Sequence, residues 1–214
     1  MLHFITQEFV DLGQFFKRNG RETVIVTAAT LFLTLDRYRP IGSEWVSTTL
    51  YYGIFPLLVV FIILRKSPGD FGLGMGSPRL WWFPTALICL VAGGILFAAS
   101  FSADLQGYYR DAGFNFITYS LTSCASLAAS EFLYRGFLLF GLKDKFHEGS
   151  ILLQMIPFVL MHLGKPELET VSTIVTGILF GYVCYRGKSF WPAFIIHLFI
   201  NVFFVSLINF RYPV

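Results

Sequence analysis

Long apolar runs, separated by short polar and charged segments, dominate the hydropathy pattern of this 214-residue chain. Runs of this kind predict helices that cross a membrane, because a spanning helix needs about 20 apolar residues. The predicted spans, about seven in number, lie at residues 22–38, 44–64, 80–101, 114–142, 150–164, 168–186 and 190–210. The first, fifth and sixth are short or polar at one edge, so the count carries a margin of one. The pattern predicts an all-α, polytopic integral membrane helical bundle.

The first residues of the chain have a different, amphipathic pattern. At helical spacing, the apolar positions are Leu2, Ile5, Phe9, Leu12 and Phe16. The polar positions between them are Gln7, Glu8, Asp11 and Gln14. Such a pattern is typical of a helix that lies in the membrane interface. We expect an N-terminal interfacial helix over residues 2–16, with a frayed chain end as the alternative.

Composition supports the membrane assignment and excludes some functions. The chain is 55% hydrophobic and only 14% charged, which is too apolar for a soluble domain. Its net charge of +3 is small and no basic stripe is present, so we expect no nucleic-acid partner. No internal repeat or separate soluble segment is visible. Residues 1–214 are therefore interpreted as a single membrane-embedded domain, with a motif-bearing core at about 114–210.

The positions of Lys and Arg outside the spans predict the topology. With a cytoplasmic N-terminus, ten lie inside, namely Lys17, Arg18, Arg21, Arg65, Lys66, Arg79, Lys143, Lys145, Arg186 and Lys188. Five lie outside, namely Arg37, Arg39, Arg110, Lys165 and Arg211. Because basic residues are enriched on the cytoplasmic side of membrane proteins, this distribution favours a cytoplasmic N-terminus and, with seven spans, an outside C-terminus.

Five polar side chains stand out within the predicted spans: Glu131, Arg135, His162, His197 and Asn201. An ionisable group in a membrane costs several kcal/mol unless it is paired or hydrated, so each is a functional candidate. Measured from the cytoplasmic ends of their spans, Glu131, His162 and Asn201 lie roughly 18 Å deep and His197 roughly 11 Å deep. The sequence thus predicts that side chains from three helices meet near the middle of the bilayer.

Each of these residues also has a structural interpretation. The i, i+4 spacing of Glu131 and Arg135 places both on one helix face, where they would form an ion pair that fixes helix packing. His162 alone would be a packed histidine bonded to a carbonyl, and Asn201 alone would bond helices together. Considered together, the five residues favour a functional site.

Three chemistries fit one carboxylate, two imidazoles and an amide. The carboxylate and a histidine would activate a water while the other histidine and Asn201 stabilise an oxyanion. Alternatively, Glu131, His162 and His197 would bind a divalent metal, although the HExxH pattern typical of zinc is absent. The third is a proton relay in a carrier, which the single charged span and the lack of a repeat disfavour. We expect no cofactor, with the metal as the weaker alternative.

Three blocks of the sequence resemble the glutamate-type intramembrane peptidases that include the type II CAAX prenyl-protein endopeptidases and their bacterial CPBP relatives. The blocks are SEFLYRG at 130–136, FVLMH at 158–162 and HLFIN at 197–201. They are similar, in the same order, to the EExxxR, FxxxH and HxxxN or HxxxD motifs of that family. The resemblance covers about the C-terminal 80 residues and is specific as a set of three.

The resemblance implies roles for individual residues. His162 would orient or help to deprotonate the attacking water, and His197 with Asn201 would form the oxyanion site. Glu131 and Arg135 match the second Glu and the Arg of the first motif. Ser130 stands where the family has its first Glu, and a serine hydroxyl is not a general base near neutral pH. Our hypothesis is that Glu131, the one acidic residue in the membrane core, is the working carboxylate.

The sequence and the resemblance together predict an intramembrane endopeptidase that cleaves a membrane-associated protein or peptide. The lipid bilayer and a membrane-anchored substrate are the expected partners, and a bacterial inner membrane is the expected location. The alternative is a catalytically inactive relative that acts as a membrane scaffold or immunity-type binding protein, which Ser130 favours.

Overall fold

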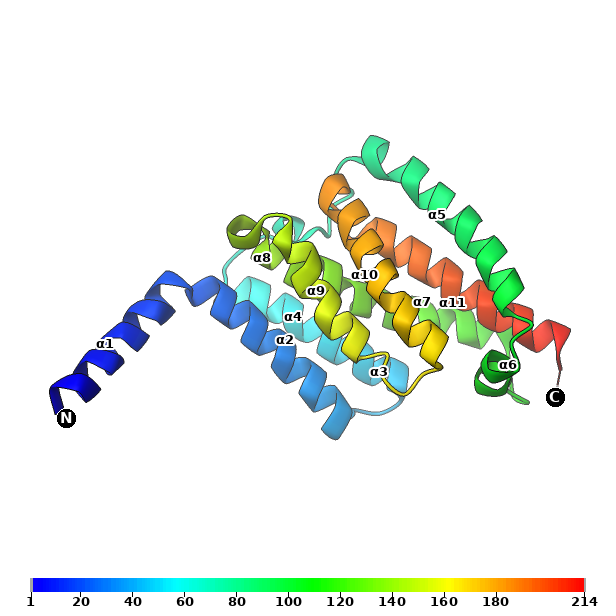
Figure 1. Cartoon of the computed structure of the whole chain (residues 1–214), viewed down its shortest axis with the longest axis horizontal. Helices are drawn as coiled ribbons and strands as arrows, with labels where there is room; N and C mark the ends of the chain where they lie inside the picture. Colours follow the sequence, from blue (N-terminus) through cyan, green and yellow to red (C-terminus); the bar gives the residue numbers. More distant parts are fainter. Residues whose placement is uncertain (1, 214) are drawn as a thin grey trace.

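The computed structural model describes residues 2–213, with side chains described from residue 6 onward, and its architecture is a bundle of helices (Figure 1). The elements are α1 Leu2–Arg18, α2 Gly20–Tyr38, α3 Glu44–Thr48, η1 Thr49–Ile54, α4 Phe55–Leu58, η2 Val59–Ile63, η3 Pro68–Phe71, α5 Pro78–Ala99, α6 Ala103–Tyr109, α7 Phe116–Glu131, η4 Phe132–Leu138, α8 Leu139–Phe146, α9 Gly149–Leu160, α10 Glu167–Gly187 and α11 Trp191–Arg211. No β-strand occurs within the described range. The predicted all-α class is confirmed.

Helical structure is present at each of the predicted spans. Among the described helices, four are long and apolar enough to cross a membrane, namely Glu44–Ile63, Pro78–Ala99, Glu167–Gly187 and Trp191–Arg211. A shorter apolar helix, α9, precedes the polar loop that leads into α10. These helices make the chain a polytopic membrane bundle, whereas the number of seven spans stays a prediction.

Helix α1 forms where the amphipathic pattern predicts it, and it projects away from the rest of the bundle (Figure 1). Leu2 and Ile5 of its predicted apolar face lie outside the residues whose side chains are described. Phe9, Leu12 and Phe16 are exposed. An exposed row of large apolar side chains on a projecting helix fits insertion into a membrane interface, which stays a prediction.

The helix that runs through residues 116–146 changes its hydrogen-bonding pattern in the middle. It is α-helical through Glu131, π-helical over η4 and α-helical again over α8. Every residue of η4 is buried. A π-helical turn widens the helix and shifts the direction of the side chains that follow, and such turns often occur at functional sites. The change begins immediately after Glu131.

Small residues allow neighbouring helices to approach this central segment and one another. A Cβ atom added to Gly53 of η1 would lie 3.2 Å from Cβ of Ala129 in α7, which agrees with the small-residue run SCASLAAS at 123–130. On the other side, a Cβ atom added to Gly181 of α10 would lie 2.6 Å from Nε2 of Gln154 in α9. Close approach of this kind is the usual packing mode of membrane helices.

The end of the bundle that carries most of the basic residues is closed by hydrogen bonds between segments distant in sequence. Phe190 N donates to Gly72 O at 3.0 Å, and Ser189 Oγ donates to Gly74 O at 2.7 Å. At the same end, Nη1 of Arg21 lies 2.5 Å from Oδ2 of Asp144, which joins α2 to α8. These contacts join the start of α2 to the central helix and the start of α11 to the loop at residues 72–74.

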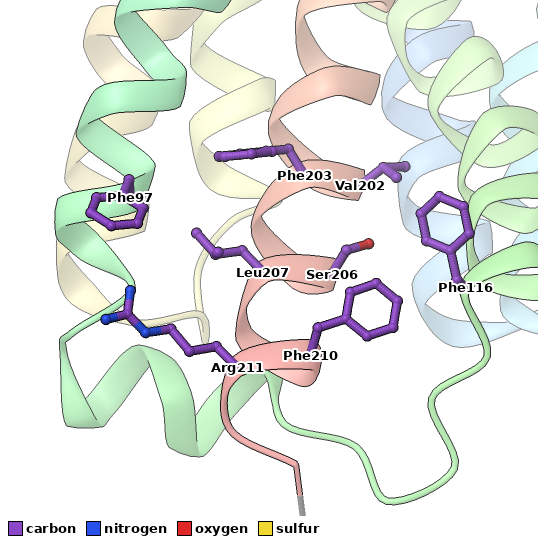
Figure 2. A pocket seen from close by; sticks show the side chains of 8 residues that line it. All are labelled: Phe97, Phe116, Val202, Phe203, Ser206, Leu207, Phe210 and Arg211. Carbon is purple, nitrogen blue, oxygen red and sulfur yellow. The ribbon is translucent and has the colours of Figure 1, made fainter.

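At the opposite end, α11 is partly uncovered between α5 and α7. Figure 2 shows the side chains of α11 that face this gap, with Phe97 on one side and Phe116 on the other. They form a shallow, mostly apolar groove of about 750 Å³, and the guanidinium of Arg211 lies 4.2 Å from the ring centroid of Phe101 beside it.

Candidate active site

Glu131 and Arg135 form the buried ion pair that their spacing predicts. Nη1 of Arg135 lies 3.0 Å from Oε1 and 2.9 Å from Oε2 of Glu131, and both side chains are 0% exposed. An ion pair without access to water must be balanced within the protein, because each unpaired charge would cost several kcal/mol. The two groups therefore act as one neutral unit.

Aromatic rings surround the guanidinium group of Arg135. Its Cζ atom lies 4.0 Å from the ring centroid of Phe158, 5.3 Å from that of Phe180 and 5.6 Å from that of Tyr134. The Nε and Nη2 atoms make no hydrogen bond to the described residues. The negative faces of the rings replace the lost hydration, so three helical segments hold the cation in place.

His197 is held by the same carboxylate. Its Nδ1 lies 2.6 Å from Oε1 of Glu131, and the histidine side chain is 16% exposed. Because Glu131 is already neutralised by Arg135, we assign the neutral imidazole with Nδ1–H donating to the carboxylate. The other ring nitrogen, Nε2, then carries a lone pair.

His162 lies two residues beyond the end of α9 and faces His197. Its Nδ1 lies 2.7 Å from the carbonyl oxygen of Phe158, and its own carbonyl accepts a 2.8 Å hydrogen bond from Thr170 Oγ1. The two imidazole rings are 6.4 Å apart between centroids and 29° from parallel. Both rings contact Phe158 edge-on, at 4.7 Å for His162 and 5.9 Å for His197. Each histidine therefore has Nδ1 occupied, whereas Nε2 has no hydrogen-bond partner among the residues that the structure describes.

Asn201 follows His197 by one helical turn, and its amide is oriented by Tyr119 of α7. The Tyr119 hydroxyl donates to Asn201 Oδ1 at 2.7 Å. With Oδ1 occupied, the Nδ2 amide is left as a donor. The sequence analysis did not predict a role for Tyr119, because no spacing rule connects two residues that are 82 positions apart.

Ser130 is half-buried, and its hydroxyl is bonded to its own helix. Oγ donates to the carbonyl oxygen of Ser126 at 2.9 Å, and no hydrogen bond joins it to the Glu131 group within the described residues. Serine commonly makes this local bond inside helices. The sequence suggested Ser130 as a residue that supports the site, and that role stays a prediction.

Gln154 is a further polar residue that the sequence interpretation missed. It is 0% exposed, and its Nε2 donates to Ile151 O and Gly177 O, both at 2.8 Å. It thereby joins α9 to α10, the helices that carry Phe158 and Phe180. A glutamine inside an apolar span was a visible signal, because buried amides in membranes normally bond to a neighbouring helix.

The metal alternative requires Glu131, His162 and His197 to point at one ion. Over the described residues, no group of three or more His, Cys, Asp or Glu side chains has an arrangement that would hold a metal. Glu131 and His197 instead face each other directly at hydrogen-bonding distance. In this arrangement Glu131 is paired with His197 and Arg135, and the expectation of no cofactor stays a prediction.

Comparison with known proteins gives one match. The family of type II CAAX prenyl endopeptidases described as Rce1-like matches residues 112–203. This range contains Glu131, Arg135, His162, His197 and Asn201. No significant match is found among curated proteins or solved structures. The chain is thus an integral membrane protein whose segment 112–203 is similar to the Rce1-like family of type II CAAX prenyl endopeptidases.

Proposed function

We propose that this chain is an intramembrane endopeptidase that hydrolyses a membrane-associated protein or peptide. The family match supports a protease in general. The observation that carries the specific proposal is the 2.6 Å bond between buried Glu131 and His197, beside the nearly parallel ring of His162. A carboxylate that orients an imidazole is the usual way in which proteases prepare a general base.

In this proposal the two free Nε2 atoms bind one water molecule. His197 takes a proton as the water oxygen attacks the peptide carbonyl carbon, and Glu131 stabilises the resulting imidazolium. His162 accepts a hydrogen bond from the second O–H group of the water and so orients it, while that hydrogen stays on the attacking oxygen. The proton held by His197 then passes to the leaving amine nitrogen as the C–N bond breaks.

The proposal modifies two expectations from the sequence. Glu131 contributes its charge through His197 and does not contact the water, because its side chain is fully buried against Arg135 and His197. His197 acts as base, and the oxyanion donor is the Nδ2 amide of Asn201, which Tyr119 holds in orientation. A single positioned donor of this kind typically contributes 10²–10³-fold to the rate.

The setting of the site favours a substrate that is itself anchored in the bilayer. Glu131 lies at the centre of a membrane bundle, and the basic end of the bundle is closed by the loop at residues 72–74. We place the N-terminus in the cytoplasm of a bacterial inner membrane, because the excess of Lys and Arg lies at that closed end.

A second candidate function follows from Ser130. In the resembling family a glutamate is expected there, whereas here the side chain is a hydroxyl committed to Ser126 O. A chain that binds an anchored peptide without cleaving it, as a scaffold or immunity-type protein, would need no base at this position.

Co-expression with candidate membrane-anchored proteins encoded nearby tests the proposal. The wild type is expected to shift the size of a substrate, and His162→Ala and His197→Ala are each expected to abolish the shift. Addition of a chelator to isolated membranes should leave the cleavage unchanged, since no step uses a metal. Cleavage that survives both substitutions contradicts the proposal, and binding without any cleavage by the wild type favours the scaffold.

A further inference from the structure

A long groove separates α2 from α9 on one side of the bundle. Its walls are the two helices, its floor includes Leu138 and Leu142 from the central helix, and its volume is about 870 Å³. The floor therefore belongs to the same continuous helix that carries Glu131. The groove is larger than the one at the end of α11, and it continues along the helices to Met161, the residue before His162.

The α2 wall combines a row of threonines with larger side chains such as Val26 and Leu33. Thr27, Thr30 and Thr34 line the groove and are exposed. Thr30 Oγ1 donates to Val26 O and Thr34 Oγ1 to Thr30 O, each at 2.8 Å. The hydroxyls of Thr30 and Thr34 are thus bonded to their own helix, and small residues of this type allow membrane helices to approach closely.

The α9 wall presents larger apolar side chains at helical spacing. Leu153, Ile156 and Leu160 line the groove and are exposed by 36%, 50% and 57%. The threonines on the α2 wall and the larger side chains on the α9 wall leave room for ridges of a third helix to interdigitate.

The two ends of the groove carry opposite charges. Glu22 lies at the basic, predicted cytoplasmic end and Arg37 at the other, and no ion pair between described residues involves either of them. Helix α2, which provides both, is 19 residues long, or about 28 Å at 1.5 Å per residue. That length matches the roughly 30 Å apolar thickness of a bilayer.

We propose that this groove docks one apolar transmembrane helix of the substrate, with a basic residue at its Glu22 end and an acidic residue at its Arg37 end. An acyl chain would need the apolar walls only, whereas a helix also uses the spacing, the length and the two unpaired charges. The chain of the docked protein would leave the groove beside Met161 and meet His162. Cleavage of the docked protein rests on the proposed function, but docking does not.

The test uses a synthetic peptide as the probe. It has a 20-residue Leu/Ala core, Lys at one end, Asp followed by a short tail at the other, and a benzophenone at its centre. The peptide is incorporated with the full-length protein into phosphatidylcholine vesicles, irradiated, and the cross-linked positions are mapped by mass spectrometry. We expect cross-links on the groove faces of α2 and α9, and at least tenfold less product from a peptide with the two charged ends exchanged.

Matched variants locate the binding. Thr30→Trp and Ile156→Trp each fill the groove from one wall and are expected to lower cross-linking at least tenfold, whereas Leu207→Trp, in the other groove (Figure 2), leaves it unchanged. Cross-links that map elsewhere, or that resist both groove variants, overturn the docking. Native mass spectrometry tests for a lipid site. If the wild type carries bound phospholipid that the two groove variants lose, and no peptide is cross-linked, the docking proposal is overturned and the groove is a lipid site.

The experiments distinguish a failure of the docking proposal from a failure of the peptidase proposal. His162→Ala is expected to keep full cross-linking and to lose cleavage of the tail. A wild type that cross-links in the groove and never cleaves supports docking and contradicts the peptidase. A wild type that cleaves while its cross-links lie outside the groove contradicts docking alone.

Discussion

Nδ1 of His197 lies 2.6 Å from Oε1 of Glu131, a carboxylate that has no access to solvent. The same oxygen accepts a hydrogen bond from Arg135, so the charge of the carboxylate is balanced before His197 is considered. This arrangement lets Glu131 fix the orientation of the imidazole without forcing it to be protonated.

Replacing the carboxylate should destabilise the fold as well as stop the chemistry. Glu131→Gln leaves the guanidinium of Arg135 buried without a counter-charge, which costs about 3–5 kcal/mol in unfolding free energy. The measurement is the unfolding midpoint in a titration with a denaturing detergent. The double variant Glu131→Gln/Arg135→Met should recover most of the stability and still show no cleavage. Equal midpoints for the wild type and Glu131→Gln would contradict the ion pair.

Tyr119 should affect the rate through Asn201. Tyr119→Phe removes the hydroxyl that holds Oδ1 of Asn201, so kcat is expected to fall about 10–100-fold, the size typical of a lost orienting partner, with KM unchanged. Tyr108→Phe, at an exposed tyrosine of α6, is the control. In an Asn201→Ala background, Tyr119→Phe should have no further effect. A full additional loss there would mean that Tyr119 acts independently of Asn201.

Replacing Ser130 should have little effect on the rate of cleavage if the chain is an active enzyme. Its hydroxyl is bonded to Ser126 O, so Ser130→Ala is expected to change the rate by less than about twofold, because only a local helix bond is lost. A tenfold fall would show that the hydroxyl takes part in the reaction. Ser130→Glu separates the two candidate functions, since activity that appears only in this variant favours the inactive scaffold.

Tyr109 joins α6 to α10 through the carboxylate of Glu169, which also lies 2.8 Å from Nζ of Lys165. Burial, followed by the neighbouring Glu169 carboxylate, raises the pKa of Tyr109 above its ordinary value of 10.0. The stability from this protonated donor is complete below about pH 10 and is lost as pH rises toward the folded-state pKa. Tyr109→Phe should lower the unfolding free energy at pH 7 by about 1.5–3 kcal/mol, as for other hydrogen bonds to charged groups.

The same variant should also lose less stability than the wild type when thermal unfolding is compared at about pH 10 and 11, because the group that titrates is gone. Identical pH profiles for the two proteins would show that Tyr109 does not stabilise the folded state through this contact.

The sequence predicted what depends on local spacing. Apolar runs located the helices, and the i, i+4 separation of Glu131 and Arg135 predicted an ion pair that the structure contains. Depth along the spans also predicted that His197 would approach Glu131, as it does.

Other features depend on contacts between distant segments and left no local signal. The π-helical turn after Glu131 changes side-chain directions without any marker in the hydropathy pattern. The stacking of Phe158 and Phe180 on Arg135 requires α9 and α10 to be in place first. The sequence also did not show that the Glu131 side chain is fully buried. This burial is the reason why we propose that Glu131 acts through His197 and not on the water directly.

The central claim, hydrolysis by the site around Glu131 and His197, is tested most directly by comparing protein termini in membranes from cells that express the wild type, His162→Ala or His197→Ala. Mass spectrometry in water enriched in ¹⁸O identifies every new carboxyl terminus and the source of its oxygen. We predict new termini in or next to transmembrane segments, labelled from water, in the wild type only. The same termini in all three membranes would contradict the claim.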